Sequence, residues 1–358
     1  LRITQDDKLI WRSSDYNQPI KLGPDGKTKI IVRDIQSSNS IGDRKEWGDK
    51  SVFAAYVYDK KGTRSRSVSV YADLAYSANP EPQSFVLSIG VSNYDADGWD
   101  LSYAANDALA FSKAFGQGLV HRPNRKDDYR IPARVVNLIS DDSESTHYSP
   151  ATKENIVAAL KSLTGSFNSE SPEVNVKGLE NFRESGWDDI VTIVFSGHGI
   201  SYGGQFYLLP QDTLDRPINE LSQEMLRSAL SSDELRSLLA PLRANHIILV
   251  LDACYSGASV TADNEFQGIP DFGDSFGQLI FDKKMTVIAA SSADSVTVES
   301  DAVGHGLLTF AMLVEGVGEG MADSSSKDGI ITLSELFDYA RKRVPNLYSA
   351  IASNRFQG

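Results

Sequence analysis

Two apolar runs that end in small and polar residues constrain the fold of this chain more than any other feature. One run, 246–251, leads into Cys254, and the other, 190–195, leads into a tight Gly-His-Gly tip at His198. Continuous apolar runs of this length are typical of strands buried on both faces of a parallel sheet. Because open α/β sheets place their chemistry at the carboxyl ends of such strands, we expect Cys254 and His198 at one edge of the sheet.

A thiol and an imidazole that face one cleft form a nucleophile with its acid/base partner. Cys254 is the only cysteine of the chain, and a lone buried cysteine in an arbitrary protein is most often an inert small hydrophobe. The acid and the glycine that flank Cys254, together with the second motif at His198, favour the chemical interpretation over the inert one.

Alternating strand and helix patterns from residue 84 onward predict a parallel α/β domain. Residues 164–187 read as loop, and 258–284 read as a polar, Gly-rich insert after the cysteine strand. Strands are expected at 85–91, 134–139, 190–195, 246–251 and 285–290, a short hairpin arm at 205–209, and helices at 104–115, 152–163, 232–239, 307–315 and 333–344.

Three of these helices begin with capping signals. Thr152 opens one helix with Asn155 three residues on, and Ser232 is expected to cap another. Thr332 and Glu335 have the spacing of a capping box.

Residues 1–76 predict a separate, small all-β domain, for which an immunoglobulin-like sandwich is the natural model. Short β-rich segments at 3–11, 29–32, 51–58 and 65–72 are separated by turn clusters, and 77–83 read as a linker. The region carries no catalytic constellation, so we expect it to dock or position the rest of the protein.

The composition limits the function classes. The chain has 358 residues with 41% hydrophobic content and a formal net charge of −13, which argues against binding to nucleic acid. No apolar run approaches the ~18 residues that span a bilayer, so we expect a soluble protein without a membrane partner. One cysteine excludes an intrachain disulfide framework. The composition does not fix the cell compartment, and the cytoplasm is the expectation. A start at Leu1 leaves open whether the chain is a piece of a longer protein.

The Ser-Gly-His-Gly motif followed, about fifty residues later, by Asp-Ala-Cys-Tyr-Ser-Gly resembles the caspase-like cysteine peptidases. The form of the cysteine motif resembles the metacaspase and bacterial orthocaspase branch, and the likeness runs from about Ser84 to Val344. It implies a caspase-like peptidase domain over 84–358. It also implies that Cys254 attacks as thiolate, that His198 manages the protons, and that N–H groups at Gly199 and Cys254 hold the oxyanion.

The resemblance also implies a preference for basic residues. It places Asp107, Asp252 and Ser196 in the pocket that receives the substrate residue before the scissile bond. Two carboxylates pair with a guanidinium or an ammonium, so cleavage after Arg or Lys is expected, with Arg preferred. The alternative is that Asp107 only caps its helix and Asp252 only ends its strand.

A calcium requirement, which many metacaspases have, is not expected here. By the family pattern Asp212 matches one calcium ligand and Asp233 another, but Ser232 stands where the family often has a second acid, and a hard cation needs several oxygens. We therefore expect no cofactor, with calcium as the open alternative. Lys283 and Lys284, at the end of the 258–284 insert, are candidate sites of self-cleavage.

Several other motifs are weaker. Gly304-His305-Gly306 repeats the Gly-His-Gly tip but follows no apolar strand, so it is expected to open a helix. The serine-hydrolase pattern at 273–277 lacks the strand that should precede it. An EF-hand-like stretch at 324–335 has serines where the first ligands belong. A cysteine phosphatase would need Arg where Val260 stands.

Two hypotheses from different classes follow. The first is an endopeptidase that cleaves after Arg or Lys, with self-processing or a partner that activates it through residues 1–76. The second is a catalytically silent scaffold that keeps the fold for binding.

Overall fold

The computed structural model describes residues 2–5, 8–12, 50–57, 64–73, 82–117, 131–141, 147–167, 174, 176–186, 188–213, 223–244, 246–255, 273–290, 304–324 and 327–355. Within these ranges, none of the helices has the length and apolar character that crossing a membrane would require.

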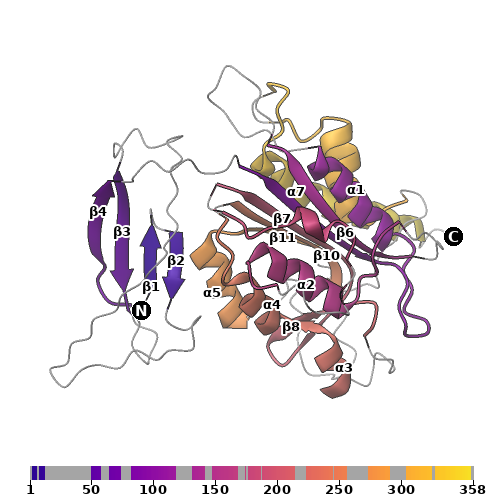
Figure 1. The fold of residues 1–358 in the computed structure, drawn as a ribbon. Coiled ribbons are helices and arrows are strands. Elements are labelled where there is room, and N and C mark those ends of the chain that lie inside the picture. The colour runs from indigo at the N-terminus through magenta and orange to yellow at the C-terminus, as the bar shows by residue number, and fades with distance from the viewer. Residues whose placement is uncertain are drawn as a thin grey trace.

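A mixed sheet of seven strands, counted over the described residues, forms the centre of the larger part of the chain (Figure 1). Five strands are parallel in the order β11-β10-β7-β5-β6, and two short antiparallel strands extend the sheet from β7. The parallel strands are β5 (Ser84–Val91), β6 (Ala133–Ser140), β7 (Ile190–Tyr202), β10 (His246–Tyr255) and β11 (Thr286–Ala289), and the antiparallel ones are β8 (Gln205–Leu208) and β9 (Leu230–Ser231).

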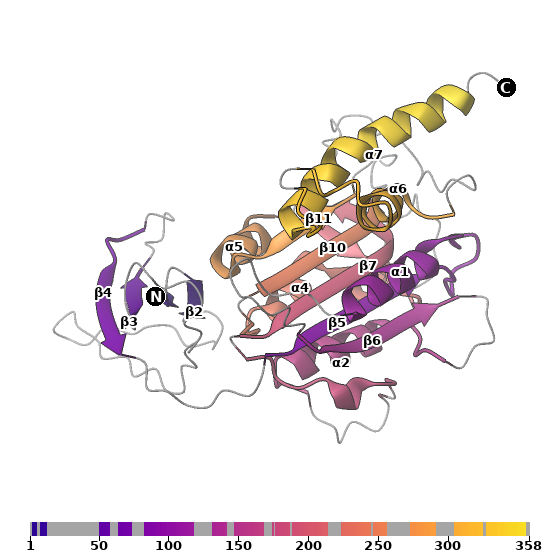
Figure 2. The same cartoon turned by 90° about the horizontal axis from the view of Figure 1, so that it is seen from above.

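Helices cover both faces of this sheet, which confirms the predicted parallel α/β architecture (Figures 1 and 2). One face packs against α1 (Ala104–Gly116), α6 (Leu307–Thr309), the π-helix η3 (Phe310–Gly318) and α7 (Leu333–Arg355). The other face packs against α2 (Lys153–Leu163), α4 (Ser232–Leu239) and α5 (Gly273–Lys283). The remaining helices are α3 (Gln223–Ser228) and the 3-10 helix η2 (Leu179–Asn181).

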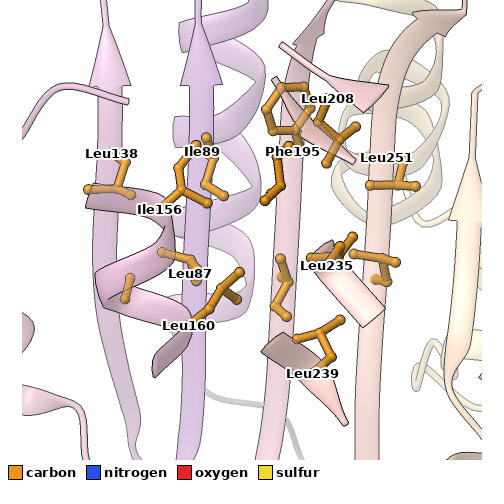
Figure 3. Close-up of a cluster of buried hydrophobic side chains, with 14 of the residues drawn as sticks. Leu87, Ile89, Leu138, Ile156, Leu160, Phe195, Leu208, Leu235, Leu239 and Leu251 are labelled. Carbon is orange, nitrogen blue, oxygen red and sulfur yellow. The ribbon is translucent and has the colours of Figure 1, made fainter. Parts of the chain in front are cut away.

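Strand residues alternate between these two helix layers, because successive side chains of a strand point to opposite faces. Leu87 and Ile89 of β5 pack with the layer of α2 and α4, whereas Val86 packs with the layer of α1 and α7. Figure 3 shows Ile156 and Leu160 of α2 against the strands. All eight residues of β5 are buried, which explains why the parallel strands read as continuous apolar runs.

The predicted caps are confirmed at two helices and displaced by one residue at the third. Thr152 accepts a hydrogen bond from the backbone N–H of Asn155 at 3.3 Å. Thr332 and Glu335 form the reciprocal capping box, with bonds of 3.0 and 3.2 Å. Ser231, not Ser232, caps α4.

Two predictions about the chain after the apolar runs are wrong. The first concerns where the two strands end. They do not end with the apolar runs before the motif residues, because β7 continues through His198 and β10 continues through Cys254. Pairing offsets the low strand propensity of the glycines, because β7 bonds to β10 and, beyond Gly199, also to β8.

The 258–284 insert is also not a loop throughout, since α5 occupies its last part. Glycines are poor helix formers and hid this helix from the sequence. Packing overrides the propensity: Phe276 of α5 is fully buried and meets the Phe206 ring edge-on at 5.4 Å, and Leu279 is also buried. The serine-hydrolase pattern at 273–277 therefore lies within a helix.

The N-terminal described residues form one antiparallel sheet in the order β2-β1-β3-β4. Its strands are β1 (Arg2–Gln5), β2 (Lys8–Arg12), β3 (Lys50–Tyr56) and β4 (Val68–Asp73). The single strand expected at 3–11 is wrong, because β1 and β2 fold back on each other and pair Ile3 with Trp11. The segment 29–32 lies outside the described residues. An immunoglobulin-like sandwich needs a second sheet, so that assignment stays a prediction.

An ion pair joins this small sheet to helix α5 of the larger part of the chain. Arg2 of β1 donates to Asp282 of α5 at 2.5 Å, and the carboxylate is almost fully buried. Strand β2 lies beside α5 in both views of the ribbon. A buried carboxylate depends on its cation, so this contact fixes where the small sheet attaches.

Candidate active site

The register of two neighbouring strands brings the cysteine and histidine motifs together. In the parallel pair β7 and β10, Cys254 stands opposite His198, and Asp252 stands opposite Ser196. Both motifs therefore lie at the carboxyl edge of the sheet, where α/β proteins place their chemistry. Gly199 follows opposite Tyr255, one residue further along.

A backbone carbonyl orients the His198 ring. The Nε2 atom of His198 lies 2.7 Å from the carbonyl oxygen of Trp99. Because a carbonyl oxygen only accepts, Nε2 carries the hydrogen, and Nδ1 of the neutral ring keeps the lone pair that takes up a proton. The sequence could not name this partner, since a carbonyl oxygen belongs to every residue type.

Tyr94 fixes the same histidine from a second side. Its hydroxyl oxygen accepts a 2.7 Å hydrogen bond from the backbone N–H of His198, and the two rings lie 5.0 Å apart. Burial raises the pKa of Tyr94 above the ordinary tyrosine value, so the phenol stays neutral beside the imidazole. The sequence signal for this role was the position of Tyr94, an aromatic residue in the loop directly after β5.

Close packing of α1 on β5 positions Asp107. A Cβ atom on Gly90 of β5 would lie only 2.7 Å from the Cβ of Ala108, so glycine lets the helix approach this closely. The Ser92 hydroxyl oxygen also accepts from the N–H of Ala105 at 3.0 Å. Asp107, in the first turn of α1, is consequently held over the strand ends and is buried.

The carboxylates of Asp107 and Asp252, called the acidic pair below, both border Gly306. A Cβ atom on Gly306 would lie 2.9 Å from Oδ2 of Asp107 and 3.0 Å from Oδ2 of Asp252. The Gly306 N–H donates to Asp107 at 2.9 Å, and the Thr309 hydroxyl donates to Asp252 at 2.8 Å. Asp107 and Asp252, which are far apart in the sequence, thus come together beside Gly306 and form one acidic site.

His305 completes this cluster. Its Nδ1 lies 2.7 Å from Oδ1 of Asp107. The hydrogen bond to Asp107 is the main cause that raises the pKa of His305, partial burial opposes it, and the charges of Asp107 and Asp252 add to the rise. The expectation that the second Gly-His-Gly opens a helix is confirmed, since Gly306 is the N-cap of α6. Its contact with Asp107 was missed.

The two calcium candidates contact other groups of the protein. Oδ1 of Asp212 accepts the N–H of Lys153 at the start of α2 at 2.8 Å, and Asp233 accepts from Gln205 at 2.9 Å. In the described part of the chain, no group of three or more His, Cys, Asp or Glu residues could hold a metal ion. The expectation that the protein does not require calcium stays a prediction.

The two candidate self-cleavage lysines differ in access. Lys283 ends α5, is buried, and donates from its ammonium to the carbonyl oxygen of Leu242 at 2.9 Å. A peptidase would have to unfold the end of α5 to reach it. Lys284 is exposed and has a positive φ of 50° between α5 and β11, so it is the more accessible of the two.

A cavity of about 550 Å³ lies elsewhere, between α2, α3, α4 and the arm of β8. None of its lining residues is a predicted site residue, and it contains both signs of charge, including Lys153, Arg227 and Glu234. The strand register, not this cavity, defines the candidate active site.

The fold and the site define a caspase-like α/β protein. The family model described as the caspase domain matches residues 83–355, so the chain belongs to the caspase domain family. Membership of this family supports a cysteine peptidase, and a peptidase implies a protein or peptide substrate. A search of curated proteins gives no match for this chain.

Proposed function

We propose that this protein is a cysteine endopeptidase of the metacaspase and orthocaspase branch that cleaves after Arg or Lys. The observation that carries the proposal is the register of β7 and β10, which sets Cys254 opposite His198 at the carboxyl edge of the sheet. Membership of the caspase domain family supports the same reaction class.

The proposed reaction has two halves. The Cys254 thiolate attacks the scissile carbonyl carbon, N–H groups of Gly199 and Cys254 stabilise the oxyanion, and the leaving amine takes a proton from His198. Water, which gives a proton back to His198, then hydrolyses the thioester and releases the acid product. The Trp99 carbonyl holds Nε2, so Nδ1 of His198 is the atom that exchanges protons.

The acidic pair supports the preference for basic residues. Asp107 and Asp252 both border Gly306, so a guanidinium that replaced the donors of this segment would meet two carboxylates. Ser196 lies beside Asp252 in the register and forms part of the same wall.

Activation by cleavage or by a partner is part of the proposal. Lys284 is exposed and Lys283 is buried, so we place self-cleavage after Lys284 rather than after Lys283. The small sheet, which Arg2 ties to Asp282, is the proposed docking point for an activating partner.

Cleavage of matched fluorogenic peptides that end in Arg, Lys or Asp tests the function. We expect hydrolysis after Arg and Lys only, with kcat/KM reduced at least about 1,000-fold by Cys254→Ala or His198→Ala. Labelling of Cys254 by an electrophilic peptide with a terminal Arg serves as a second readout. Cleavage only after Asp would overturn the pocket assignment, and an unlabelled, inactive wild type would favour the silent scaffold.

A further inference from the structure

The acidic pair already holds donors from one short stretch of the chain. His305, Gly306 and Thr309 all donate to Asp107 or Asp252, at distances of 2.7 to 2.9 Å. His305 is the donor among them that becomes a cation on protonation, because the other two are a backbone amide and a hydroxyl. A group of the protein itself that can carry a positive charge therefore lies where the proposed function puts the substrate cation.

Asp107 is more deeply buried than His305, the residue bonded to it. The side chain of Asp107 is 3% exposed, whereas that of His305 is 26% exposed. Gly306 leaves no room for a side chain against either carboxylate, so the stretch lies closely over the acidic pair.

We propose that His305 is an internal competitor for the basic residue of the substrate, and that the protonated imidazole closes the acidic pair until a guanidinium or ammonium displaces it. The inference rests on the proposed function, because it names what regulates that same pocket. It makes His305 a residue that sets substrate affinity through Asp107, with no contact to the reacting atoms.

The charge of His305 decides how strongly it competes. Among the described residues, the titratable groups that act on it are Asp107 from α1 and Asp252 from β10, and both favour the imidazolium. In acid the imidazolium offsets one of the two negative charges of the acidic pair. Above the pKa of His305 the ring is neutral, and both negative charges act on the substrate.

The competition has a measurable size. At pH 5.5, one unit below the ordinary histidine pKa of about 6.5, at most about a tenth of His305 rings are neutral. If only the pocket with the neutral ring accepts a basic residue readily, the apparent KM rises at least about tenfold. The rise should shrink as the pH increases through the pKa of His305, and kcat should follow the catalytic pair instead.

The first test compares three proteins that differ in charge at one position. His305→Asn keeps a neutral donor for Asp107, and His305→Lys supplies a cation at every pH tested. For an Arg peptide, we expect KM of the wild type to fall about tenfold from pH 5.5 to 8.5, KM of H305N to stay low and flat, and KM of H305K to stay high. A wild-type and an H305N profile that coincide within twofold would overturn the inference while leaving the peptidase intact.

The second test needs no catalysis and separates this inference from the proposed function. Benzamidine, a small guanidinium-like cation, is titrated into Cys254→Ala protein, and the His305 ring is followed by NMR. We expect binding to be about tenfold weaker at pH 5.5 than at 8.5, and the pKa of His305 to fall when benzamidine is bound. Equal binding at both pH values, or a His305 pKa that benzamidine does not change, would refute it even if Arg peptides are cleaved.

Discussion

Two of the places where a basic side chain of this protein bonds to oxygen atoms of the same chain differ in what that side chain can do. At the acidic pair the cation is His305, paired with Asp107. Between α2 and α4 it is Lys153, whose ammonium donates to the carbonyl oxygens of Arg227 and Ala229 and to Glu234, each at 2.8 Å.

Lys153 uses all three of its donors on protein oxygens, which is the full capacity of an ammonium. Lysine side chains as a class stay charged through the neutral range, whereas imidazoles exchange their proton there. The Lys153 contact is therefore a permanent part of the structure, and the His305 contact is one that pH can release. The same kind of charge pairing serves stability in one place and control of access in the other.

Within this comparison, the largest effect should come from removing one charge of the acidic pair. We expect Asp252→Asn or Asp107→Asn to lower kcat/KM for Arg peptides about 100- to 1,000-fold, mainly through KM, because truncating one partner of a close charge pair costs several kcal/mol. Steady-state kinetics measures this. Asp338→Asn, on the exposed side of α7, is the matched control and should leave kcat/KM unchanged. If both pocket variants keep kcat/KM within threefold of wild type, the acids only hold the start of α6.

A smaller effect, on stability, is expected from removing the Lys153 ammonium. Lys153→Met leaves two carbonyl oxygens and Glu234 without their donor, so we expect it to lower the free energy of unfolding by about 2 kcal/mol. Urea denaturation measures the loss, and Lys161→Met on the exposed side of the same helix is the control. Calcium should leave the wild-type Tm unchanged, since the candidate ligands Asp212 and Asp233 already accept hydrogen bonds from Lys153 and Gln205. A rise of several degrees with calcium would contradict that reading.

The sequence predicted the elements whose signals are local. Parallel strands such as β5 and β10 were visible because burial on both faces makes them mostly apolar. Helix starts at Thr152 and Thr332 were visible because a cap is a contact between residues three apart. The juxtaposition of Cys254 and His198 followed from one rule, that parallel strands end at the same edge.

What the sequence did not predict depends on contacts between distant segments or on the backbone. The Trp99 carbonyl that orients His198 has no side-chain signature. The contact of His305 with Asp107 joins residues almost two hundred positions apart, so the second Gly-His-Gly looked like a helix start and nothing more. Helix α5 was missed because the packing of Phe276 outweighs its glycines.

A third charge pair provides a purely structural reference. Arg343 of α7 binds Glu315 of the π-helix through two bonds of 2.7 Å, and Tyr339 donates to the same carboxylate. The Arg343 hydrogen bonds are the main cause that lowers the pKa of Glu315. We expect Arg343→Gln to cost about 1.5 kcal/mol of unfolding free energy at pH 7, with no effect on KM.

The lowered pKa of Glu315 sets the sign of the pH dependence of this stabilisation. A lowered folded pKa means that the contribution is present above the ordinary glutamate value of about 4.3 and is lost as the pH falls through the folded value. Denaturation of wild type and Arg343→Gln at pH 7 and pH 3.5 should show the difference shrinking in acid. Arg341→Gln, a neighbouring arginine whose side chain is 73% exposed, should cost little at either pH.

The smallest effect on the free energy of unfolding is expected at His305, and its pH dependence has the opposite sign to that of Glu315. Because its folded pKa is raised, its stabilising contribution is fully present below the unfolded value of about 6.5 and is lost as the pH rises through the folded value. In a Cys254→Ala background, His305→Asn should therefore lower the free energy of unfolding most near pH 6 and least near pH 8.5. We expect less than about 1 kcal/mol, since the ring is partly exposed. Urea denaturation across this range measures it, and a difference that grows with pH would show that the imidazole is not held as a cation by Asp107.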